Sequence, residues 1–140
     1  MTYNFTVTEL VESIKKEVSR FAASAYSDDG SSLYDAYRIL SRDEETLEGH
    51  ISDAVDAICV RLFDVALKSG DGIVFNVPDY DSSMSTSIND QLDRFIVMRS
   101  CAMWLEEKGA PEYERYEKRA VSALDNAHIL IKSRKAPKRS

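Results

Sequence analysis

The residues that could perform chemistry in this 140-residue chain are two histidines, two cysteines and many carboxylates. His50 and His128 fall in separate predicted helices, and neither has a second histidine one helical turn away to help it bind a metal. Asp79 and Asp81 form a D-x-D pair suited to a divalent cation, but the glycine and distant glutamate of a calcium loop do not follow. We therefore predict no metal site and expect both histidines to face solvent or an interface.

Motifs of the common catalytic sites are missing from the sequence. It contains neither of the phosphate-binding loops G-x-x-x-x-G-K-[ST] and G-x-G-x-x-G, nor the nucleophile elbow G-x-S-x-G. Cys59 and Cys101 lie in apolar helical stretches, so we expect two buried free thiols in a reducing compartment. We therefore predict a protein with no catalytic residues and no cofactor.

Charge is unevenly distributed along the chain. The formal net charge is −6, yet residues 132–140 hold five basic residues and no acid, which leaves −11 on the rest. An acidic body repels nucleic acid, whereas a basic tail suits an acidic partner or a phosphate backbone. The alternative is a tail that only improves solubility. The basic residues of the tail are Lys132, Arg134, Lys135, Lys138 and Arg139.

The apolar residues are not concentrated into targeting segments. The N-terminus has neither the basic region nor the apolar region of a secretion signal. No stretch approaches the roughly 20 apolar residues of a membrane span. We therefore expect a protein that stays in the cytoplasm, with no membrane contact.

Hydrophobic periodicity predicts four main helices and one short helix. Thr6 and Glu9 form a capping box before the first helix, and Ser41 and Glu44 form a second such pair before a long apolar stripe. In the last helix, small residues on the inner face favour a close approach to its neighbour. The predicted helices cover residues 7–26, 33–40, 42–68, 88–108 and 111–131.

One segment, residues 73–77, does not have a helical pattern. It is β-branched and aromatic, and it follows a glycine-rich turn, which together predict a strand. The sequence does not decide which strand pairs with it. The serine-rich segment 80–87 could return as the second strand of a hairpin, or a neighbouring subunit could supply a strand. Four tyrosines are difficult to bury in so small a bundle and indicate partner contacts: Tyr3, Tyr34, Tyr37 and Tyr80.

The predicted fold class is therefore all-α. We expect a bundle of four main helices plus a short one, with a strand-like or β-hairpin insert at residues 71–87 between the third and fourth long segments. Residues 1–131 would form one helical domain, and residues 132–140 a basic tail.

From about Ser41 onward the order of elements resembles a known family. A long helix with an acidic start is followed by a strand-like insert, a helix ending in W-L-E-E-K-G, and a last helix entered through A-P-E-Y-E-R-Y and followed by I-K-S-R-K-A-P. This order resembles the small helical head–tail connector (adaptor or neck) proteins of tailed bacteriophages and prophages. The resemblance implies a homo-oligomeric ring beneath a portal protein, with projecting segments that contact neighbouring subunits or the portal.

The resemblance implies a non-enzymatic structural protein that acts in virion assembly and is found in the host-cell cytoplasm or in a virion. The insert would contact another subunit or the portal, and the tail would dock on an acidic portal surface or lie near packaged DNA. The alternative is a small helical regulatory or nucleic-acid-associated protein that binds through its basic tail. The candidate partner-binding residues are Ile73, Val74, Phe75, Val77, Tyr80, Lys132, Arg134, Lys135, Lys138 and Arg139.

Overall fold

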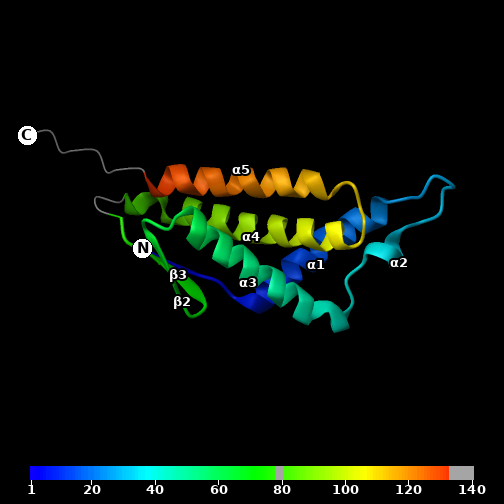
Figure 1. Ribbon diagram of the computed structural model, residues 1–140, viewed down its shortest axis with the longest axis horizontal. Coiled ribbons are helices and arrows are strands. Elements are labelled where there is room, and N and C mark those ends of the chain that lie inside the picture. The colour runs from blue at the N-terminus through cyan, green and yellow to red at the C-terminus, as the bar shows by residue number, and fades with distance from the viewer. Residues whose placement is uncertain (78–80, 133–140) are drawn as a thin grey trace, which may run out of the picture.

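The computed structural model describes residues 1–77 and 81–132. Most of these residues are helical (Figure 1). Helix α4 lies between α5 on one side and α1 and α3 on the other. The helices are α1 (Val7–Ser24), α2 (Tyr34–Tyr37), α3 (Glu44–Arg61), α4 (Ser85–Glu107) and α5 (Tyr113–Ile131), with two short 3-10 helices, η1 (Ser41–Asp43) and η2 (Ser82–Met84).

Helix α4 takes the central position because its apolar residues lie on all sides. The four consecutive residues 95–98 are all buried, which an amphipathic surface helix does not show. Helix α5 packs against it antiparallel through Ala120, Ala123 and Ala127, all at most 1 % exposed. These small side chains let the two helices approach closely, as the sequence predicts.

A small antiparallel sheet covers one end of the bundle. Its strands are β1 (Thr2–Asn4), β2 (Ala66–Ser69) and β3 (Gly72–Phe75), and their order is β1-β3-β2. A two-residue turn joins β2 to β3, and Gly70 in that turn has φ +56°, a left-handed conformation that glycine adopts without a steric cost. The N-terminus extends the pairing, since the Met1 carbonyl accepts a hydrogen bond of 2.8 Å from the Phe75 amide.

The predicted strand is confirmed at Gly72–Phe75, but both alternatives for its partner are wrong. It pairs with β1 and with β2, whereas the serine-rich segment leads through η2 into the first turn of α4. The fold is therefore mostly helical, as predicted, but it also contains a three-stranded sheet that the all-α class does not include. The predicted β-hairpin insert between the third and fourth long helices is present, at residues 66–75 instead of 71–87, and residues 2–4 add a third strand to it.

The third predicted helix is too long. Helix α3 ends at Arg61, and Ala66–Ser69 form strand β2 instead of two further helical turns. Leu62 is still buried, but the chain then turns so that residues 66–69 pair with β3. Backbone pairing with a neighbouring strand outweighs the moderate helix propensity of these residues. Within the described residues, no helix combines the length and apolar character needed to cross a membrane.

Candidate interaction surface

The sheet has one buried face and one exposed face. Tyr3, Ile73 and Phe75 point into the core and are at most 3 % exposed. On the opposite face, the strand register places Val74 between Thr2 of β1 and Leu67 of β2. Because side chains alternate along a strand, this exposed row follows directly from the burial of Tyr3 and Ile73.

Large apolar side chains are exposed on this outer face and around the end of α3. Val60, in the last turn of α3, and Phe63, just after that helix, are 74 % and 81 % exposed, and Leu67 and Val74 on the hairpin are 70 % and 39 % exposed. The end of α3, the hairpin and the C-terminal end of α5 lie at the same end of the molecule (Figure 1). We call Val60, Phe63, Leu67 and Val74 the hairpin-end apolar residues.

Ion pairs attach this end of α3 to α5. The Arg61 guanidinium lies 3.0 Å from the Asp125 carboxylate, and the Lys132 ammonium pairs with the Asp64 carboxylate. The hydrogen bond from Lys132 lowers the pKa of Asp64. The two pairs connect the segment around Phe63, which follows α3, to the last helix.

The predicted partner-binding residues do not form one site. Ile73 and Phe75 are buried in the core, so their prediction as partner contacts is wrong. Val74 is exposed on the outer face, and Val77 is partly buried. Lys132 is already paired within the chain. The other predicted contacts lie outside the described residues: Tyr80, Arg134, Lys135, Lys138 and Arg139.

The prediction that the tyrosines contact partners is wrong for Tyr3. Its ring is 1 % exposed, and its hydroxyl donates a hydrogen bond to the Asp93 carboxylate on α4. Tyr37 is half-buried and packs against Phe21, with 5.6 Å between the ring centroids. Only Tyr34, at 36 % exposure, lies at the surface as expected, whereas Tyr80 lies outside the described residues.

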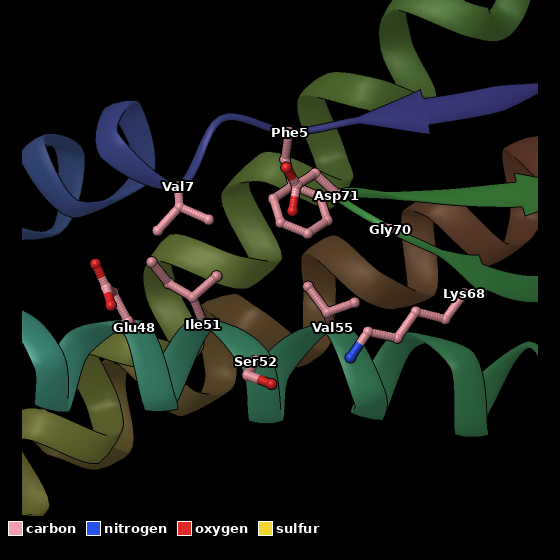
Figure 2. Close-up of a pocket in the computed structure, with 9 residues that line it drawn as sticks. All are labelled: Phe5, Val7, Glu48, Ile51, Ser52, Val55, Lys68, Gly70 and Asp71. Atoms are coloured by element: carbon pink, nitrogen blue, oxygen red, sulfur yellow. The ribbon is translucent and has the colours of Figure 1, made fainter.

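A groove of about 370 Å³ lies between α3 and the segment that links β1 to α1 (Figure 2). Apolar side chains from both sides of the groove face one another. Lys68 borders the groove, and its ammonium lies 3.2 Å from the Asp56 carboxylate. The apolar lining residues are Phe5, Val7, Ile51 and Val55, and the polar ones are Glu48, Ser52, Lys68 and Asp71, beside Gly70. Apolar side chains with a few polar groups at the border are the lining that ligand-binding grooves commonly have.

His50, Asp93 and Cys101 do not line this groove. His50 is only 8 % exposed, with its Nε2 atom 3.3 Å from the Glu107 carboxylate at the end of α4, so the expectation of a solvent-facing or interface position is wrong. Burial raises the pKa of the Asp93 carboxyl and of the Cys101 thiol. Among the residues that the structure describes, no three His, Cys, Asp or Glu side chains are grouped so that they could hold a metal ion.

The helix predicted over residues 42–68 includes Phe63 and Leu67 in its apolar run, whereas both side chains are exposed beyond the end of α3. Two signals in the sequence indicate the hairpin: the acid Asp64 inside the apolar run, and the G-D-G turn, which can join two strands as well as end a helix. Comparison with protein-family models, with curated proteins and with solved structures found no match for this chain.

Proposed function

We propose that this chain is a non-enzymatic assembly subunit, and specifically a head–tail connector (adaptor) of a tailed phage or prophage that forms a homo-oligomeric ring and contacts a portal protein. The observation that supports this proposal is the exposure of the hairpin-end apolar residues. Their side chains project from elements that packing and ion pairs hold in place. A preorganised apolar surface of this kind is typical of a protein–protein contact.

Burial of this surface in a contact would contribute favourably to assembly. Complete burial of a Phe or Leu side chain contributes about 1.5–3 kcal/mol relative to leaving it in water. Phe63 and Leu67 are both at least 70 % exposed, so most of this contribution is still available for a contact with a second copy. Burial of Val60 and Val74 in the same contact would add to it.

The sheet offers a second means of contact. Strands β1 and β2 are its two edges, and each has a single strand partner within the sheet. Backbone N–H and C=O groups on a free strand edge pair readily with a strand from another chain. An incoming segment at the β2 edge would lie next to Leu67, so strand addition and apolar burial support the same contact.

The proposal is tested by the oligomeric state. Sedimentation velocity on the full chain is expected to show a homo-oligomer, and the double substitution Phe63→Ser with Leu67→Ser is expected to reduce it to a monomer. Val121→Ser is the matched control, because Val121 is also exposed (53 %) but lies on α5. Far-UV circular dichroism checks that all variants remain folded.

A monomeric wild-type chain at high concentration, or an oligomer that the double substitution leaves unchanged, would refute the assembly role. The specific role as a connector has its own test, which is binding to the portal protein encoded beside this chain. If no portal or major capsid gene is adjacent, the connector assignment fails even when the oligomer forms.

A further inference from the structure

A second groove, of about 420 Å³, lies between helices α4 and α5. We call it the basic groove, and its lining residues are Gln91, Arg94, Lys118, Arg119, Ser122 and Asn126. On α5, residues three or four positions apart share one face, so Lys118, Ser122 and Asn126 form a stripe along the helix. Gln91 and Arg94 form the facing stripe on α4, which packs alongside α5.

The basic groove concentrates positive charge on a protein with a net charge of −6. Its lining contains three cations and no carboxylate. Within residues 1–77 and 81–132, Arg94, Lys118 and Arg119 form no ion pair. The guanidinium of Arg119 lies 5.4 Å from the centre of the Tyr116 ring, a contact that orients it without neutralising it.

The carboxylates nearest in sequence do not change this balance. Glu117 is already paired with Arg99, at 2.8 Å between the guanidinium and the carboxylate. Asp90 and Glu114, one helical turn before Arg94 and Lys118, do not line the groove, although Glu114 and Glu117 line an adjoining hollow that shares Lys118 and Ser122 with it. The lining of the groove itself presents three cations to an anionic ligand.

We propose that the basic groove binds the phosphate backbone of a nucleic acid without reading its sequence. Arginine and lysine neutralise phosphates, and Gln, Asn and Ser side chains donate hydrogen bonds to phosphate oxygens. From Lys118 to Asn126, eight residues at about 1.5 Å rise span about 12 Å. At about 3.4 Å of axis per phosphate of one strand, this length covers three to four phosphates. The lining contains no aromatic side chain on which a base could stack.

This site is distinct from the basic tail, which the sequence indicates as a possible contact for DNA. The basic groove belongs to the folded helices, whereas residues 133–140 follow α5 and contain four of the basic residues counted there. The proposal does not depend on ring formation, because a single chain supplies all six lining residues. Deletion of residues 133–140 therefore separates the two contributions.

The test is fluorescence anisotropy of the full chain with labelled duplex DNA between about 50 and 200 mM salt. The groove variant carries Arg94→Gln, Lys118→Gln and Arg119→Gln. The charge-matched control carries Lys16→Gln, Arg20→Gln and Arg42→Gln, three exposed residues outside the groove. Each phosphate contact contributes about 0.9 to the slope of log Kd against log salt, so the groove variant should lose about 2.7 from that slope.

We expect the control to keep the wild-type salt dependence of Kd. The chain without residues 133–140 should keep the contribution of the groove to that salt dependence, which is the contribution that the groove variant loses. The proposal is overturned if the wild type does not bind, if the groove variant and the control behave alike, or if the tail deletion alone abolishes binding. Displacement of the DNA by micromolar inorganic pyrophosphate would instead identify a small-anion site. A groove variant that changes only the oligomeric state would identify a contact between copies.

Discussion

Gly72 is the glycine at which an added Cβ atom would meet other atoms within 4 Å. It begins β3 and is paired on one side with Asn4 and on the other with Ser69. A Cβ atom added there would lie 2.6 Å from the Tyr3 carbonyl oxygen and 2.7 Å from the Asn4 side-chain oxygen. The Asn4 side chain can rotate away, but the Tyr3 oxygen belongs to the backbone of β1. Gly72→Ala therefore requires β1 to move.

The size of the effect follows from these distances. An ordinary contact of 3.4 Å requires a displacement of about 0.8 Å from 2.6 Å. Overpacking of this kind typically costs about 1–3 kcal/mol. The strand that must move carries the fully buried Tyr3 ring, so we expect a loss of about 2 kcal/mol, equivalent to a Tm lowered by about 5–10 °C.

Urea denaturation followed by the fluorescence of the single tryptophan, Trp104, measures this loss. Gly49→Ala is the matched control, because a Cβ atom at Gly49 on α3 meets nothing within 4 Å. Alanine is a better helix former than glycine by about 0.8–1 kcal/mol, so the control is expected to gain stability. Adding Asn4→Ala to Gly72→Ala should restore little of the lost stability, because the backbone oxygen of Tyr3 stays in place.

The reasoning would be refuted if Gly72→Ala matched the wild type within about 0.5 kcal/mol, the ordinary range for a surface substitution. It would also be refuted if Asn4→Ala rescued the variant completely. Either result would mean that β1 does not pair with β3 at this distance.

Two further predictions concern the core face of the sheet and its partner on α4. Ile73→Ala should cost about 2–5 kcal/mol because Ile73 is fully buried, whereas Val74→Ala should cost under about 1 kcal/mol; equal losses in urea denaturation would contradict the assigned register. Burial raises the pKa of Asp93 above its unfolded value, so its contribution to stability falls as pH rises through the folded pKa. Asp93→Asn should therefore gain stability relative to the wild type between about pH 4 and pH 7, and a constant difference would count against this.

Local signals in the sequence are sufficient for the helices that pack through one periodic stripe. The first and last predicted helices, 7–26 and 111–131, correspond to Val7–Ser24 and Tyr113–Ile131. Apolar spacing, the N-terminal threonine and the proline before the last helix act within a few residues, so they can be recognised without a neighbour. The Thr6 side chain makes no capping hydrogen bond, although the residue stands at the predicted N-cap.

The sheet depends on contacts between distant parts of the chain. Thr2–Asn4 pair with residues about 70 positions away, and no local pattern in so short a segment specifies that partner. The same pairing removes Ala66–Ser69 from the helix that their apolar spacing suggests. It also decides which side chains of β3 are buried, and so which ones can contact a partner.

The distribution of charge also has one part that the sequence predicts and one part that depends on the tertiary structure. The excess of basic residues after Ile131 is visible in the sequence, because it is a property of composition. Lys118 and Arg119 alternate with glutamates along their helix, and this pattern is typical of an ordinary solvated face. They become part of a site without carboxylates because the packing of α5 against α4 places Arg94 across the groove from them. The number and sequence positions of the charged residues can therefore be taken from the sequence, whereas the grouping of Arg94, Lys118 and Arg119 into one groove results from helix packing.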